Sequence, residues 1–118
     1  MNPSPDLKGA VLIVSREGMG SGPLDLQRRL LSTYLCLLLE NRWTPLAVCF
    51  YTDGVKLLTD GSPVLEPLRE LEAAGVRLIA CKTCLDYFSL TDKLRVGIIG
   101  GMGDIMTATA MATKVISL

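Results

Sequence analysis

Five short runs of aliphatic residues recur along the chain, and stretches with helical spacing separate them. The clearest run, AVLIV at residues 10–14, contains no polar residue, which is typical of a strand buried on both faces of a sheet. Strands that alternate with helices predict a mostly parallel sheet joined by right-handed crossovers. The other runs lie at residues 46–50, 76–80, 94–99 and 115–118.

The stretches between these runs place helices on both faces of the sheet. We therefore expect one small, doubly wound α/β domain over residues 1–118, with a flavodoxin-like architecture. The stretch at residues 24–42 has a polar stripe, but most of its other positions are leucine. Because this apolar surface is wider than one sheet face needs, we expect a second subunit to cover the excess. Further helices are expected at residues 104–114 and after the N-cap candidate Ser62, with a start near Glu66 as the alternative because of Pro67. Residues 85–90 are expected to form a short irregular or helical piece.

The composition excludes several classes of function. Apolar residues make up 49% of the 118-residue chain and charged residues 20%, which excludes intrinsic disorder. Twelve basic residues balance twelve acidic ones and aromatic residues reach only 5%, so the chain lacks the charge and the stacking surfaces of a nucleic-acid binder. Histidine is absent, which removes imidazole bases, Ser-His-Asp and Cys-His nucleophiles and histidine-ligated metals.

The sequence contains no pattern of a targeting or membrane-spanning segment. Residues 1–6 are polar, and the apolar run at 10–14 is too short to span a bilayer and lacks the flanks of a signal peptide. We therefore expect a cytoplasmic protein without membrane contacts. In that reducing compartment cysteines favour catalysis or ligand binding over a disulfide framework, but Cys36, on a helix stripe, and Cys49, in a buried strand, are expected to be structural.

Four loops follow the predicted strands and are expected to meet at one edge of the sheet. These loops comprise residues 15–22, 51–54, 81–84 and 100–103. Ligands of open parallel sheets bind beyond the carboxyl ends of the strands, so this edge is the expected site. The binding residues expected from these loops are Gly18, Gly20, Gly22, Gly54, Lys82, Thr83, Gly101 and Met102.

The glycine-rich loops have two interpretations. Gly18, Gly20 and Gly22 precede a helix, so their backbone N–H groups could hold an anion. They are equally consistent with a turn that needs positive φ, because the loop lacks both the Gly-Lys-Ser/Thr ending of a P-loop and the full dinucleotide-binding fingerprint. The loop around Gly101 has the same two interpretations.

The CxxC motif formed by Cys81 and Cys84 carries the most chemistry. Two thiols at this spacing can close a small disulfide, bind a soft metal, or act as a nucleophile with a resolving thiol. Lys82 and the start of a following helix would favour the thiolate. The alternative is that both thiols are buried as small apolar side chains. Structural zinc needs four ligands, so a single pair without histidine predicts no metal and no cofactor unless subunits share an ion.

Several segments together match a known family. The matching segments are VLIVS at residues 11–15 with its glycine loop, GVKL at 54–57, GSPVL at 61–65 and CKTCLD at 81–86. Through them the chain, over about residues 11–116, resembles the DsrE-like domain of YedF-type selenium metabolism proteins in the DsrE/TusD sulfur-relay group. Two positions depart from that subgroup, which usually has Gly at the place of Lys82 and Asn at the place of Gly101. The first departure could change loop geometry or thiol acidity, and the second removes a side-chain amide near Met102.

The resemblance implies a DsrE-like fold that assembles as a homotrimer or a larger ring. It implies that Cys81, directly after the third strand, carries a persulfide and that Cys84 is the second cysteine of the subgroup. Relatives often carry a TusA-like sulfur-carrier domain ahead of this one, so a protein of that kind is expected to act here in trans.

Three functions remain open from the sequence. The leading one is a sulfur or selenium carrier or transferase in which Cys81 accepts the chalcogen and Cys84 resolves the adduct. The second is thiol–disulfide redox chemistry or redox sensing by the same pair. The third is a non-enzymatic trimeric module that binds a small anion or a partner protein at the strand ends.

Overall fold

A five-stranded, all-parallel sheet forms the centre of the molecule, with the strand order β4-β3-β2-β1-β5. The computed structural model describes residues 6–118, so most of the polar segment 1–6 lies outside the described residues. The prediction of a doubly wound, mostly parallel sheet is confirmed. The strands are β1 (Ala10–Val14), β2 (Ala47–Phe50), β3 (Arg77–Cys81), β4 (Ile98–Gly100) and β5 (Lys114–Ser117).

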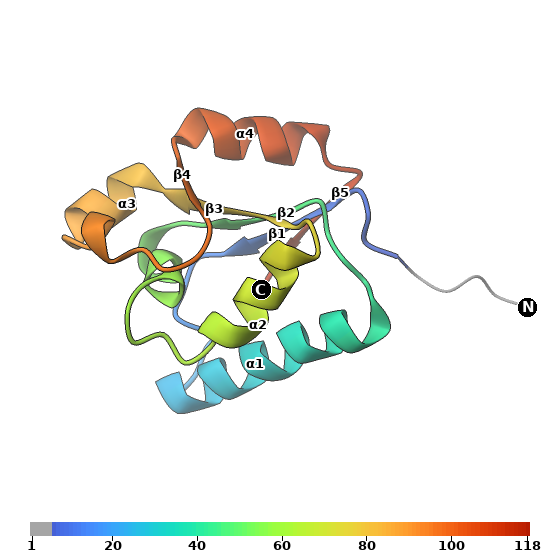
Figure 1. The fold of residues 1–118 in the computed structure, drawn as a ribbon, viewed down its shortest axis with the longest axis horizontal. Helices are drawn as coiled ribbons and strands as arrows, with labels where there is room; N and C mark the ends of the chain where they lie inside the picture. Colours follow the sequence, from blue (N-terminus) through green and yellow to red (C-terminus); the bar gives the residue numbers. More distant parts are fainter. Residues whose placement is uncertain (1–5) are drawn as a thin grey trace, which may run out of the picture.

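Helices cover both faces of the sheet (Figure 1). The long helix α1 (Leu24–Asn41) and α2 (Leu65–Ala73) lie on one face, and α4 (Met102–Met111) lies on the other. Along the chain, the strands β1, β2, β3 and β4 are added toward one edge of the sheet, and the chain then crosses back to add β5 at the other edge. Right-handed crossovers that run in opposite directions place their helices on opposite faces of the sheet. Among the helices of residues 6–118, none is both long and apolar enough to cross a membrane. The short helices are α3 (Lys82–Tyr87), η1 (Thr52–Leu58) and η2 (Thr91–Lys93).

Strand β1 lies at the centre of the hydrophobic core. All five of its residues are buried, as the aliphatic run predicted. Leu31, Leu35 and Leu38 of α1 are also buried, and their spacing of three to four residues forms one helix face against the sheet. Leu68 and Leu71 of α2 complete this layer. The core therefore fixes where β1, β2 and β3 end, and these ends carry the candidate site.

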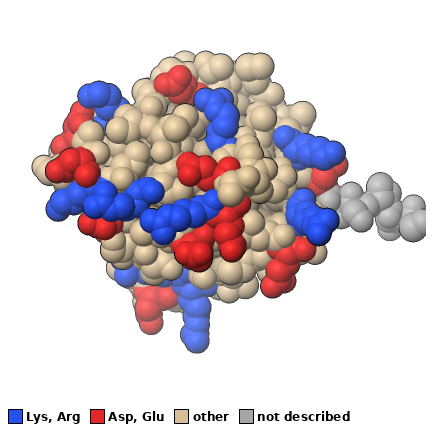
Figure 2. Space-filling view, viewed as in Figure 1, with Lys and Arg blue, Asp and Glu red and all other residues tan. Residues whose placement is uncertain are grey.

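Two apolar areas of the surface remain uncovered. Leu26, Leu30 and Leu37 of α1 are exposed, in agreement with the surplus leucine surface predicted for this helix. A second area spans β4 and α4, where Ile98 is exposed and Met106 is 64% exposed. Figure 2 shows charges of both signs mixed over much of the visible face, whereas the surface over α4 carries few of them.

The predicted strand at residues 94–99 is shorter in the structure. Its first half pairs elsewhere, since Leu94 forms an isolated antiparallel bridge with Thr59. Gly97, with a φ of 87°, then turns the chain into β4. The apolar run therefore contains two short pieces with different partners, which the pattern of side chains alone does not distinguish.

Helix α2 begins at Leu65, so the prediction that Ser62 is its N-cap is wrong. Ser62 Oγ instead accepts a hydrogen bond from the Val64 N–H, at 3.2 Å, in the turn ahead of the helix. Pro67 falls in the first turn of α2, where the backbone N–H groups have no partner within the helix. A proline there leaves no hydrogen bond unmade, which explains how the helix accommodates it.

Candidate dithiol site

The ends of four strands meet at the left edge of the sheet in Figure 1. The register pairs Val14 with Phe50, Phe50 with Ala80, and Cys81 with Gly100. The segments that follow these residues therefore start side by side. The site at this edge consists of the two thiols after β3 and the loop residues around them.

Thr52, the first residue of η1, links three of these segments. Its backbone N–H donates a hydrogen bond to Cys84 Sγ at 3.0 Å, and its hydroxyl lies 2.7 Å from the carbonyl oxygens of both Ser15 and Tyr51. A hydroxyl has one proton, so it donates to one of these carbonyls at a time. The sequence places residues 51–54 in a loop at this edge without singling out Thr52, whose position directly after a buried strand is the one signal that marks it.

Thr52 also has an unusual backbone conformation. Its φ is 48°, in the left-handed region, which costs a non-glycine residue about 1–2 kcal/mol. Such a conformation persists only where the surrounding contacts hold it. Here the hydroxyl contacts to Ser15 and Tyr51 hold Thr52 and aim its amide at the Cys84 sulfur.

The two thiols of the CxxC motif differ in access to solvent. Cys81 is the last residue of β3 and is only 2% exposed, whereas Cys84 in α3 is partly exposed. Cys84 thus lines a cavity, whereas Cys81 does not. Among the described residues, none of those that line this cavity is charged. The cavity has a volume of about 270 Å³ and is lined by Thr52, Thr83, Cys84, Tyr87 and Phe88.

Opposing effects set the acidity of the Cys84 thiol. The pKa of Cys84 lies above its ordinary value, because burial raises it most and the neighbouring Cys81 thiol raises it further, while the N–H of Thr52 lowers it in part. Lys82, which we expected to favour the thiolate, pairs with Asp86 instead, with 2.9 Å between Nζ and Oδ2. The Thr52 amide is therefore the contact that favours a charged Cys84 sulfur, against the effects of burial and of Cys81.

The glycine-rich loop between Gly18 and Gly22 folds as a turn. Gly20 and Gly22 have φ values of 75° and 142°, which glycine adopts readily. The Met19 N–H donates to the Gln27 carbonyl at 3.0 Å, and a Cβ on Gly18 would collide with the backbone of Gln27. These contacts favour the turn interpretation, and none of the three predicted glycines lines the dithiol cavity.

Two further predicted residues have structural partners at the same edge. Gly54 packs against the end of β1, where a Cβ would collide with the Val14 carbonyl. The Gly101 N–H donates to Asp104 Oδ2 at 2.8 Å, which starts α4 at Met102, two residues earlier than predicted. Of the predicted binding residues, Thr83 lines the dithiol cavity directly.

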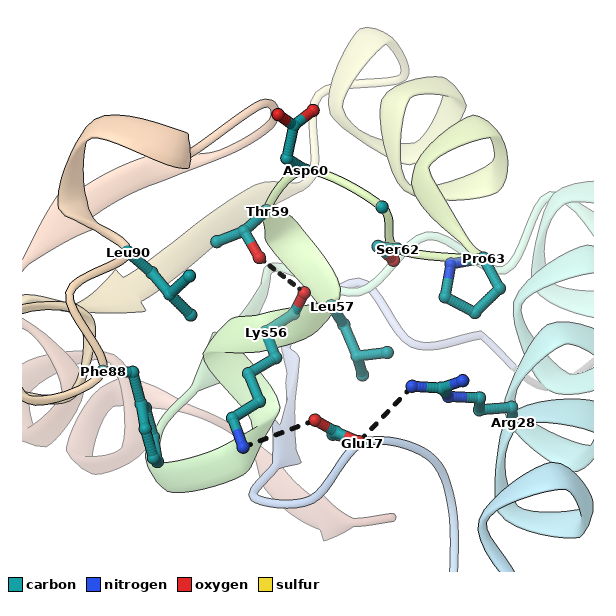
Figure 3. Close-up of a pocket in the computed structure, with 11 residues that line it drawn as sticks. Glu17, Arg28, Lys56, Leu57, Thr59, Asp60, Ser62, Pro63, Phe88 and Leu90 are labelled. Carbon is teal, nitrogen blue, oxygen red and sulfur yellow. Dashed lines mark hydrogen bonds and ion pairs between the residues drawn. The ribbon is translucent and has the colours of Figure 1, made fainter.

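A second cavity, of about 320 Å³, shares the Phe88 ring with the first (Figure 3). Glu17 lies between two cations there, 3.5 Å from Lys56 Nζ and 3.4 Å from the Arg28 guanidinium. Lys56 also pairs with Asp53 at 2.9 Å and lies 4.3 Å from the centre of the Phe88 ring. The hydrogen bond with Asp53 raises the pKa of Lys56. These contacts fasten η1 to its neighbours, and no sequence pattern predicts them.

The remaining cysteines lie apart from the pair. Cys49 is buried in β2 and burial raises its pKa, while Cys36 is exposed on α1. Within residues 6–118, no three His, Cys, Asp or Glu side chains gather closely enough to hold a metal ion.

This fold and site define a class of small, doubly wound α/β proteins with a cysteine pair after the third strand of a parallel sheet. The chain belongs to the DsrE/DsrF-like family, whose model matches residues 11–118. The resemblance noted from the sequence is thereby confirmed at the level of this family. No curated protein matches the chain.

Three solved structures illustrate the similarity in fold. The ychN protein from E. coli and MTH1491, a protein of unknown function from Methanobacterium thermoautotrophicum, are each 22% identical, with a TM-score of 0.70. Those matches cover 95% and 96% of this chain, respectively, and 100% of both relatives. BT1422, a conserved protein of unknown function from Bacteroides thetaiotaomicron, is 17% identical with a TM-score of 0.65, over 93% of this chain and 95% of that one. At these identities the likeness is one of fold alone.

Proposed function

We propose that this protein is a sulfur or selenium carrier or transferase that works through Cys81 and Cys84. The observation that carries the proposal is the Thr52 N–H, 3.0 Å from a cavity-facing thiol. A hydrogen bond to sulfur stabilises the thiolate, which is the form that attacks a persulfide. Membership of the DsrE/DsrF-like family is consistent with the sulfur-relay class.

The proposed reaction moves one sulfur atom between thiols. A thiolate of the pair attacks the terminal sulfur of a donor persulfide, a new S–S bond forms, and the donor leaves as a thiolate. An acceptor thiolate then attacks the same terminal sulfur and regenerates the thiolate on this protein. The cycle needs no oxidant or reductant, because the transferred sulfur keeps its oxidation state throughout.

Intact-mass spectrometry without reductant tests this proposal. The Cys36→Ser variant is the right background, because the exposed Cys36 thiol would react with any donor. After exposure to glutathione persulfide, we expect the mass of one sulfur atom to be added, and the addition to be lost when Cys81 and Cys84 are both replaced by serine. An adduct that survives the double replacement, or no adduct at all, would contradict the proposal.

A second function is thiol–disulfide redox chemistry by the same pair. It is favoured by the two thiols being close enough for Cys81 to influence the pKa of Cys84. In the same experiment a disulfide removes two hydrogens from the mass and adds no sulfur. A redox titration would then give the potential of the pair, which must lie in the cytosolic range for this function.

We also propose that the protein is a cytoplasmic homo-oligomer, with a trimer favoured by the family resemblance and a TusA-like carrier as partner in trans. The uncovered apolar side chains of α1 and of the β4–α4 area support an assembly of identical copies. Light scattering of the wild type beside Leu30→Glu and Met106→Glu tests this point and tells the two areas apart. A monomeric wild type would remove the assembly from the proposal.

A further inference from the structure

We propose that Cys84, and not Cys81, is the thiol that receives the incoming sulfur, with Thr52 as the residue that positions it. This inference rests on the proposed function and assigns an order to its two thiols. It reverses the order that the family resemblance implies, in which Cys81 is the acceptor.

Access to the sulfur atom is the first argument. Thiol–disulfide and persulfide exchange need the attacking sulfur to approach in line with the bond that breaks, so a covered thiol reacts slowly. Cys84 lines the cavity of about 270 Å³, whereas the side chain of Cys81 is 2% exposed and does not line it. A donor that enters this cavity therefore meets the sulfur of Cys84 first.

Charge stabilisation is the second argument. The thiolate and the persulfide anion both carry negative charge on sulfur, and the Thr52 N–H donates to Cys84 Sγ at 3.0 Å. Because Lys82 is paired with Asp86, this amide is the polar group that the structure directs at the reacting sulfur. It makes no such contact with Cys81.

The Thr52 hydroxyl keeps the amide in place. It lies 2.7 Å from the carbonyl oxygens of Ser15 and Tyr51, which belong to the segments after β1 and β2. The backbone at Thr52 is in the left-handed region with a φ of 48°, so loss of the hydroxyl contacts would let this peptide relax away from the sulfur. Thr52 is thus a positioning residue that acts through its own backbone.

In the proposed step, Cys84 thiolate attacks the terminal sulfur of a donor persulfide. A bond forms between Cys84 Sγ and that sulfur, the donor's S–S bond breaks, and its electron pair leaves with the donor thiolate. Cys81 takes no part in this step. It remains available to attack the Cys84 persulfide afterwards.

A time-resolved labelling experiment tests the order of the thiols. In the Cys36→Ser background, the protein is mixed with substoichiometric glutathione persulfide, quenched with an alkylating reagent and mapped by peptide mass spectrometry. The sulfur is expected on Cys84 at the earliest times, and Cys84→Ser is expected to slow uptake by about tenfold or more because only the covered thiol is left. Cys81→Ser is expected to keep its label on Cys84.

The outcomes separate this inference from the proposed function. First labelling at Cys81, or normal uptake by Cys84→Ser, would overturn the order of the thiols while leaving a sulfur carrier. Failure of every variant and of the wild type to take up sulfur would overturn the proposed function itself, and this inference with it.

The role of Thr52 is tested by the pH dependence of Cys84 alkylation. Thr52→Val keeps the side-chain volume and loses the hydroxyl, so we expect the midpoint to rise by about half a pH unit as the amide contact weakens. Thr52→Ser retains a hydroxyl and is expected to restore the wild-type midpoint. Thr33→Val, which removes a similar hydroxyl contact to the Arg29 carbonyl on α1, serves as the control. An unchanged midpoint in Thr52→Val would overturn the assignment of Thr52.

Discussion

Replacement of Gly54 by alanine is expected to destabilise the protein strongly. Gly54 lies in η1 against the end of β1, and a Cβ there would collide with the Val14 carbonyl oxygen. It would also lie 2.8 Å from the Val14 carbonyl carbon and 3.3 Å from the Ser15 nitrogen. These are backbone atoms at the end of a buried strand and of the residue after it, so the methyl group cannot be accommodated by a side-chain rotation.

The size of the effect follows from this geometry. To reach an ordinary contact distance, η1 must move away from β1 by roughly 1.5 Å, and overpacking of this kind costs about 1–3 kcal/mol or more. Because the obstructing atoms are backbone, we expect the upper end, about 3 kcal/mol. For a domain of this length that is a fall in Tm of about 10–15 °C.

Thermal unfolding followed by circular dichroism measures this change, with all variants at one protein concentration because an oligomer's Tm depends on it. Gly103→Ala is the matched control. A Cβ on Gly103 in α4 meets nothing within 4 Å, so alanine there is expected to stabilise the helix by about 0.5–1 kcal/mol. A Gly54→Ala protein that unfolds within about 2 °C of the wild type would refute the reasoning.

Three further predictions concern stability. Burial raises the pKa of Cys49, so the neutral thiol's contribution to the free energy of unfolding is full below the unfolded-state pKa of about 8.5 and is lost as pH rises through the higher folded-state pKa. Urea titrations at about pH 7 and about pH 10 should therefore show that Cys49→Ala loses less stability between these two pH values than the wild type does. Asp60 accepts two hydrogen bonds from Arg95, at 3.1 and 3.0 Å, but both side chains are exposed to solvent. Asp60→Asn should therefore cost no more than about 0.5–1 kcal/mol, and less in high salt, whereas a larger loss would contradict the assumption that solvent screens this pair. Leu68 is fully buried, so Leu68→Ala should cost about 2–5 kcal/mol in the same urea titrations, and a smaller loss would show that the core closes over the gap.

Elements defined by local patterns could be predicted from the sequence. The aliphatic run of β1 has the predicted bounds, and α1 differs by one residue at its end. The predicted strand at 94–99 fails for a physical reason, since the Leu94–Thr59 bridge joins residues far apart in the chain. A run of apolar side chains carries no information about which partner each half will choose.

The site was predictable in its place but not in its contacts. Parallel topology put the Cys81–Cys84 loop beside the loop after β2, because strand ends in such a sheet share an edge. The amide of Thr52 could not be foreseen, since every residue except proline has an N–H and only the three-dimensional path aims this one at Cys84. The same holds for the ring of Phe88, which lines two cavities from a segment that the sequence left irregular or helical.

The position of β5 beside β1 has a consequence for how the protein folds. Residues 10–13 pair with residues 114–117, so these contacts close a loop of about a hundred residues, and contacts of such separation form slowly. Until β5 docks, one edge of the all-aliphatic strand β1 has unpaired N–H and C=O groups. An open edge of that kind invites pairing with another unfinished chain. The arrival of β5 therefore covers this aliphatic edge and leaves the more polar strand β5, with Lys114 and Ser117, at the edge of the finished sheet.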